Sequence, residues 1–302
     1  MDCGQKGGKP MRKTMEQIVL EGQAQKCSSM EELFLLWQLM QQMEEDPMGN
    51  TCHPGIDPRS FHIDGILSPE QFGGVLYILK ETNMKKYIRE GQTMPVITDV
   101  RTSLRSGKSR TGEVEFLRHL SGMQELLERE QAVKGSLKKD EETAGKRVGE
   151  KAGEKASGLE DYPLNHAAVL YINKRGGTGG ADEISLNYGR YYIEWIGRQI
   201  RLMDPKVIVC CGEDIFRLIV MEVFRNKREK KNQEIYMKWK NLIEGDVFFA
   251  DQAYRPVRTE QKAAVSVLRM WSPAYRVNNG RYVSLEEYLS EFERRVKAWK
   301  KS

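Results

Sequence analysis

Polar and charged residues directly follow several short apolar runs in this 302-residue sequence. The four polar segments are 80–83 (KETN), 173–180 (NKRGGTGG), 212–214 (GED) and 271–276 (WSPAYR). Carboxylate and amide side chains of this kind can position water or read the polar edge of a base. Glycines let a ligand approach the backbone, and lysine or arginine side chains pair with phosphate. The pattern therefore favours a ligand that carries both a base and phosphate groups.

The elements that would position these residues are four apolar runs with the profile of buried strands. They are 75–79, 167–172, 207–211 and 264–270. Helical patterns lie between them, such as 186–203, whose apolar stripe contains Ile196 and Ile200. The sequence therefore predicts an α/β fold of three layers, with a central four-stranded parallel sheet and helices on both faces. The carboxyl ends of parallel strands share one edge, so we expect the four polar segments to build one cleft there.

The sequence also predicts how the chain is divided into an extension, a domain and an insert. Residues 1–57 form an N-terminal extension with a helix at 15–42, and residues 58–302 form the α/β domain. A charged insert at about 131–160 interrupts the domain and has few large aliphatic side chains, which is typical of a solvated spacer. Residues 247–250 are a candidate edge strand.

Composition limits the classes of protein that are expected. No apolar run approaches the ~18 residues of a membrane span, and the first residues lack the apolar core of a signal peptide. Five cysteines, an odd number, indicate reduced thiols and a cytoplasmic protein. No cofactor is expected, and no metal either, because Cys27, Cys52, His53 and His62 match no common zinc spacing. The net charge of +5 is compatible with a polyanionic partner such as DNA, and the sequence leaves any protein partner unknown.

Four segments carry a resemblance to a known family. They are VLYILKET (75–82), VLYINKRGG (169–177), RQIRLMDPKVIVCCG (198–212) and RMWSPAYR (269–276). Together they resemble the uracil-DNA glycosylase-like superfamily, most closely its poorly characterised bacterial branch. The resemblance implies a DNA glycosylase that hydrolyses the N-glycosidic bond of a flipped, damaged or modified base in DNA. The first motif lacks the usual glycine and proline, and Ser272 stands where many members have histidine.

The resemblance and the strand-end positions together assign candidate roles. Glu81, Asn83 and Ser272 are the candidate catalytic residues, and Asn173 is the candidate base-binding residue. The candidate phosphate or DNA contacts are Lys174, Arg175, Gly176, Gly177, Tyr275 and Arg276. Structural alternatives remain open: Glu81 as a surface carboxylate, Asn173 as a turn closer, and Tyr275 as a core aromatic.

Two other functions compete with the glycosylase. One is a catalytically idle nucleic-acid-binding module of the same fold, which the altered first motif favours. The retained carboxylate at Glu81 favours the enzyme instead. A weaker alternative is an α/β protein that binds a nucleotide or small metabolite, because folds of this class host many functions.

Overall fold

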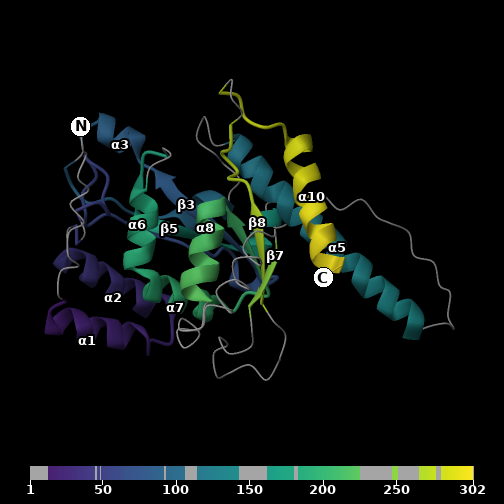
Figure 1. The fold of residues 1–302 in the computed structure, drawn as a ribbon, viewed down its shortest axis with the longest axis horizontal. Helices are drawn as coiled ribbons and strands as arrows, with labels where there is room; N and C mark the ends of the chain where they lie inside the picture. The colour runs from purple at the N-terminus through teal and green to yellow at the C-terminus, as the bar shows by residue number, and fades with distance from the viewer. Residues whose placement is uncertain are drawn as a thin grey trace, which may run out of the picture.

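The computed structural model describes most of the chain (Figure 1). The described residues are 13–44, 46–47, 49–91, 93–105, 114–142, 162–179, 183–224, 247–250, 265–276 and 280–301, with backbone alone for 131–142 and 248–250. The helices are α1 (Met15–Ala24), α2 (Met30–Met43), α3 (Lys85–Arg89), α4 (Val100–Arg105), α5 (Val114–Glu142), α6 (Ile184–Tyr191), α7 (Ile193–Met203), α8 (Glu213–Leu218) and α10 (Leu285–Lys301). Short 3₁₀ turns at Pro69–Gln71 and Pro163–His166 and a π-helical turn at Ile219–Val223 complete the helical elements of this part of the chain.

Six strands form one mixed sheet in the order β2-β5-β3-β6-β8-β7. Their bounds are β2 (Gly65–Ile66), β3 (Val75–Asn83), β5 (Ala167–Gly177), β6 (Val207–Cys211), β7 (Val247–Ala250) and β8 (Val265–Met270). The inner strands β5, β3, β6 and β8 pair in parallel, whereas β2 and β7 pair antiparallel at the two edges. The predicted α/β class is confirmed, as is the edge strand at 247–250. The expected sheet of four parallel strands was incomplete, because a two-residue strand such as β2 leaves no periodicity in the sequence.

Strands β3 and β5 extend beyond the apolar runs that predicted them. Their polar ends pair with each other, Glu81 opposite Asn173 and Asn83 opposite Gly177, with an irregularity between the two pairs. Strand β6 has already ended at Cys211, which is level with Met270 of β8. In β3 the apolar run marks the buried part of the strand, whereas β5 stays buried to its polar end. The candidate residues of both strands lie on these extensions.

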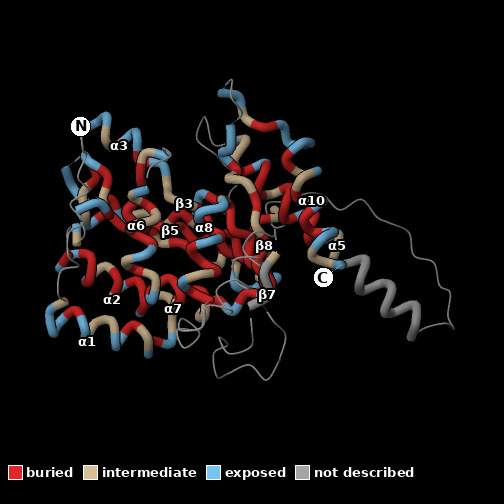
Figure 2. Tube along the Cα trace, in the orientation of Figure 1, coloured by how far each residue is buried: buried red, intermediate tan, exposed pale blue. Residues whose placement is uncertain are grey.

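Buried residues are concentrated in the strands and in the helices that flank them (Figure 2). They form two cores, one on each face of the sheet, and side chains along a strand alternate between them. From β3, Leu76 and Ile78 enter a core shared with α2, α6, α7 and α8. Tyr77 and Leu79 enter the opposite core, which α5 and α10 cover. Helices on both faces give the three layers expected of an α/β domain.

The N-terminal helices belong to the first of these cores rather than to a separate extension. The single helix predicted at 15–42 is two helices in the structure. The second begins after Ser29, whose side chain caps it by accepting a hydrogen bond from the Glu32 backbone N–H (3.1 Å). Trp37 of α2 is fully buried and packs against Tyr188 and Trp195. The boundary predicted at residue 57 therefore does not separate two cores.

A second, smaller sheet and the continuation of α5 complete the described fold. A separate two-stranded parallel ladder joins β1 (Phe61–Ile63) to β4 (Ile97–Asp99). Of the predicted insert at 131–160, residues 131–142 continue α5, and the remainder lies outside the described residues. None of the helices described is both long and apolar enough to cross a membrane.

Candidate functional site

The topology places the expected site between β3 and β6. From β3 the chain continues to β5 on one side of it, and then to β6 and β8 on the other side. The connections therefore change direction at the boundary between β3 and β6. In open parallel sheets, ligands bind outside the carboxyl ends of the strands at such a switch point. The polar end of β3, with Glu81, lies at this place.

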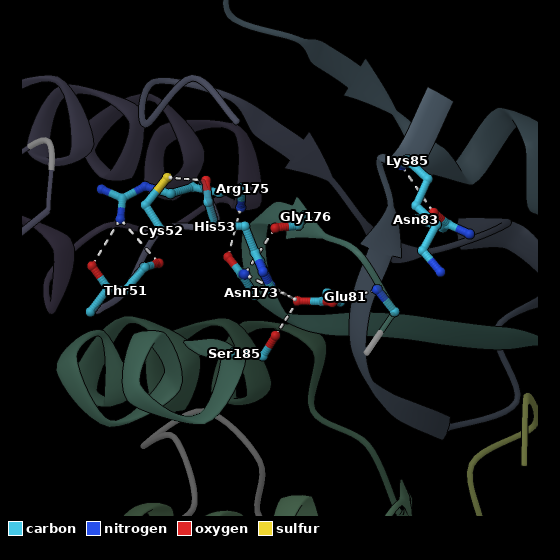
Figure 3. Close-up of polar contacts among 11 residues, drawn as sticks. Thr51, Cys52, His53, Glu81, Asn83, Lys85, Asn173, Arg175, Gly176 and Ser185 are labelled. Atoms are coloured by element: carbon cyan, nitrogen blue, oxygen red, sulfur yellow. Dashed lines mark hydrogen bonds and ion pairs between the residues drawn. The ribbon is translucent and has the colours of Figure 1, made fainter. Parts of the chain in front are cut away.

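Glu81 is the centre of a buried polar cluster (Figure 3). Its Oε2 accepts hydrogen bonds from His53 Nε2 (3.0 Å), Asn173 Nδ2 (3.3 Å) and Ser185 Oγ. Its Oε1 accepts from the backbone N–H of Gly179 (2.9 Å). The Glu81 side chain is only 1% exposed, so both carboxylate oxygens are enclosed by donors from the protein itself.

The donors keep Glu81 ionised. Burial by itself raises the pKa of Glu81, but hydrogen bonds from His53 and Ser185, the attraction of His53 and the N–H of Gly179 outweigh burial and lower it. A general base needs an accessible lone pair and a pKa near the working pH. Glu81 has neither in this conformation, so the geometry does not match the water-activating role expected of it.

Asn173 closes a turn with its own side chain. Its Oδ1 accepts from the Arg175 backbone N–H (3.0 Å), and its Nδ2 donates to the Gly176 carbonyl (3.0 Å) as well as to Glu81. The residue is fully buried. Both ends of the amide are therefore occupied, which corresponds to the structural alternative and leaves no free edge for a base.

Lys174 is a core residue, contrary to its expected contact with phosphate. It is fully buried, and its Nζ lies 2.5 Å from Asp64 Oδ2. The ammonium also lies 5.4 Å from the ring centroid of Trp37 and 5.9 Å from that of Phe34. Because β5 continues as a covered strand as far as Gly177, Lys174 points into the helix-covered core instead of toward solvent.

Arg175 is likewise buried and used internally (Figure 3). Its Nε donates to the Pro58 carbonyl (2.7 Å), and its terminal nitrogens donate to the Glu44 carbonyl (2.8 Å) and Thr51 Oγ1 (3.1 Å). The guanidinium thus fastens the segment before β1 to the end of β5. It cannot reach a phosphate in this conformation, so the expected contact is not found.

Gly176 and Gly177 allow the protein's own side chains to approach, rather than a ligand. A Cβ at Gly177 would lie 2.1 Å from the Glu81 carboxylate. Gly176 has φ +80°, and a Cβ there would lie 2.8 Å from Thr82 Oγ1 and 2.9 Å from His62 Nε2. Both glycines are therefore required by the packing at the ends of β3 and β5.

His62 lies next to Gly176 and has no hydrogen-bond partner within the described part of the chain. Both of its ring nitrogens are buried, as is Thr82 Oγ1, which is also unpaired there. Burial, and to a lesser degree the charge of Lys174, lowers the pKa of His62 to about 4. The imidazole is therefore neutral at physiological pH.

The remaining candidates lie at the surface of the same sheet edge. Asn83 is exposed, and its Oδ1 accepts from the Lys85 backbone N–H (3.0 Å), well apart from the Glu81 cluster in Figure 3. Ser272 follows β8, and its Oγ accepts from the Ala274 backbone N–H (3.3 Å). One strand separates β8 from β3, which corresponds to about 10 Å at the usual strand spacing. The three candidate catalytic residues therefore do not converge on one point.

His53 and Ser185 are the cluster members that the sequence did not reveal. The sequence offers His53 only as a zinc ligand whose spacing matches no common site, and the described residues contain no group of side chains arranged to hold a metal. The two residues lie 28 and 104 positions from Glu81, so no local motif joins them. The first turn of α6 carried no signal that it would face β3.

Compared with protein-family models, with curated proteins and with solved structures, the chain matches none.

Proposed function

We propose that this protein is a nucleic-acid-binding α/β module whose candidate catalytic position is idle. The observation that carries the proposal is the enclosure of Glu81 by His53, Asn173, Ser185 and Gly179. Glycosidic hydrolysis needs a carboxylate or amide at the sugar to position water. A carboxylate that is 1% exposed and bonded on both oxygens is unable to do so without giving up its partners.

Exposed cations at the carboxyl edge support the binding part of the proposal. Lys85, Lys86 and Arg89 are on α3, which begins directly after β3, and Arg276 is exposed after β8. Phosphate contacts of this kind supply most of the affinity in non-specific binding of nucleic acids. The net charge of +5 and the resemblance to a DNA-processing superfamily point to the same class of partner.

A DNA glycosylase is the second candidate, and one observation favours it. Glu81 is ionised and lies at the end of β3 beside the switch point, where a ligand of this kind of sheet is expected. In such an enzyme the binding of a flipped nucleotide would have to release the carboxylate from its internal donors. A small-metabolite ligand remains the weakest of the three functions.

Incubation with DNA carrying a panel of modified bases, followed by detection of abasic sites, separates these functions. We expect salt-sensitive binding and no abasic product. Abasic sites made by the wild type and lost in Glu81→Gln would instead establish the glycosylase. The absence of any nucleic-acid binding at low salt would refute the proposal.

A matched pair of charge variants tests the binding surface. Lys85→Gln combined with Lys86→Gln removes two charges from α3. We expect the log–log dependence of affinity on salt to become shallower by about 0.9 for each duplex phosphate that the variant no longer neutralises. Lys26→Gln, at an exposed position in the connection between α1 and α2, is the control and should leave the slope unchanged.

A further inference from the structure

Four aromatic rings form a continuous column from the core to the surface beyond β8. His119 stacks on Tyr288, with centroids 4.1 Å apart and an interplanar angle of 10°. Tyr288 meets Trp271 edge to face at 6.3 Å, and Trp271 stacks on Tyr275 at 5.6 Å and 28°. His119 and Tyr288 are fully buried, whereas Tyr275 is 46% exposed. The column therefore ends in a ring with one face supported by Trp271.

Hydrogen bonds hold the segment that carries this ring. His119 Nδ1 donates to the Pro273 carbonyl (2.7 Å), and Tyr288 Oη donates to the Trp271 carbonyl (2.7 Å). The Tyr275 N–H donates to the Ser272 carbonyl (2.8 Å), which closes a turn. The exposed ring is thus fixed before any ligand arrives, and fixing a binding group in advance reduces the entropy lost on binding.

A cation follows the exposed ring in the chain. Arg276 is the next residue, and its guanidinium lies 4.4 Å from the ring centroid of Tyr282 while donating to that residue's hydroxyl (3.0 Å). It also donates to the Gly280 carbonyl (3.3 Å), and the residue remains exposed. A supported aromatic face and a fixed positive charge on consecutive residues match a nucleotide, whose base stacks and whose phosphate pairs with arginine.

We propose that Tyr275 is a stacking platform for an unpaired base, so that the protein selects single-stranded over double-stranded nucleic acid. This inference rests on the nucleic-acid-binding function proposed above. Bases inside a duplex have both faces covered by their neighbours, whereas a single strand presents a free face to the ring. His119 is a positioning residue, because it orients the segment through the Pro273 carbonyl and supports the column through Tyr288.

Fluorescence anisotropy with the full chain and three labelled oligonucleotides tests the platform. The ligands are an oligothymidine strand, a blunt duplex of equal length, and a strand of abasic spacers with the same number of phosphates. Tyr275→Ala should weaken binding to oligothymidine about 5- to 150-fold, the range that one stacked base supplies. Binding to the duplex and to the abasic strand should not change. Tyr275→Phe, which retains the ring, should bind like the wild type.

Two variants of His119 test whether this residue positions the segment that carries Tyr275. His119→Ala should weaken binding to oligothymidine alone, while His119→Asn retains an N–H near the position of Nδ1 and should restore much of it. Thermal melting of both variants separates a loss of positioning from a loss of folding.

The outcomes distinguish the platform from the proposed function. Equal affinity for single strand and duplex, unaltered in Tyr275→Ala but still steeply salt-dependent, would overturn the platform and leave nucleic-acid binding intact. A wild type that binds none of the three oligonucleotides would overturn both.

Discussion

The ends of β5 and β8 look alike in the sequence and differ completely in the structure. Each polar segment follows an apolar run that forms a parallel strand, at the same edge of the sheet, and each contains an arginine. After the apolar run of β5, Lys174 and Arg175 are fully buried; Lys174 pairs with Asp64, and Arg175 donates hydrogen bonds within the protein. After β8, Tyr275 and Arg276 are exposed. The position at the end of a strand therefore indicates where a ligand can bind, but the covering elements decide whether the side chains can reach it.

Much of the cover over Lys174 and Arg175 comes from the N-terminal part of the chain, and α6 also lies against β5. Helix α2 supplies Trp37 and Phe34 against Lys174, and the segment before β1 supplies the carbonyl of Pro58 to Arg175. Burying a charge is unfavourable unless it is compensated; Lys174 is paired with Asp64, and Arg175 is hydrogen-bonded to backbone carbonyls and to Thr51. Arg276 instead packs on the ring of Tyr282 and stays exposed among the residues that the structure describes.

The largest expected effect is the loss of stability in Lys174→Ala. Its removal leaves Asp64 as a fully buried carboxylate without its cation, which typically lowers the free energy of unfolding by about 3–5 kcal/mol. Urea denaturation at neutral pH measures this difference. Arg276→Ala, the matched change after β8, should lie within about 0.5 kcal/mol of the wild type. Equal and small effects of the two variants would remove the contrast between the strand ends.

The next effect is a pH dependence from His62 beside Gly176. Its pKa is lowered from 6.5 to about 4, so the unfolded chain binds a proton that the folded protein excludes. Stability is therefore full above pH 6.5 and falls as the pH decreases from 6.5 to about 4, by about 3 kcal/mol in all. Denaturation midpoints at pH 7, 5.5 and 4.5 should fall less steeply in His62→Gln. Parallel slopes in the two proteins would show that this histidine is not excluded from protonation.

The smallest expected effect is the loss of stability in Gly177→Ala, at the glycine that lies against the Glu81 carboxylate. Gly177→Ala would place a Cβ 2.1 Å from the carboxylate, and we expect a loss of about 1–3 kcal/mol from the displacement this forces. Gly22→Ala in the exposed part of α1 meets nothing within 4 Å and should instead stabilise the protein by about 1 kcal/mol. Thermal melting of both variants compares them directly. A neutral Gly177→Ala would mean that Glu81 moves away easily, which would strengthen the glycosylase interpretation.

Much of the fold could be predicted, because buried strands appear as short apolar runs and amphipathic helices as apolar residues on one helical stripe. The runs at 75–79 and 207–211 became β3 and β6 since each is covered on both faces. The site was harder to predict, because one partner of Glu81 is His53, from a segment without periodicity. The side-chain direction of Lys174 depended on Asp64, whose position in the core is fixed by contacts to Gln199 and the Tyr171 N–H. Such long-range pairing has no local signal.

The central place of β3 also bears on how the chain folds during synthesis. This strand is made early, yet its neighbours on either side begin at Ala167 and Val207, which leave the ribosome much later. Until then, both edges of an apolar strand lack their hydrogen-bond partners, a condition that promotes association between chains. Helices α6 and α8, which lie against β3, also follow it in the chain, so one face of the strand lacks this cover as well until they are made. Truncated products that end before Ala167 should therefore aggregate or require a chaperone.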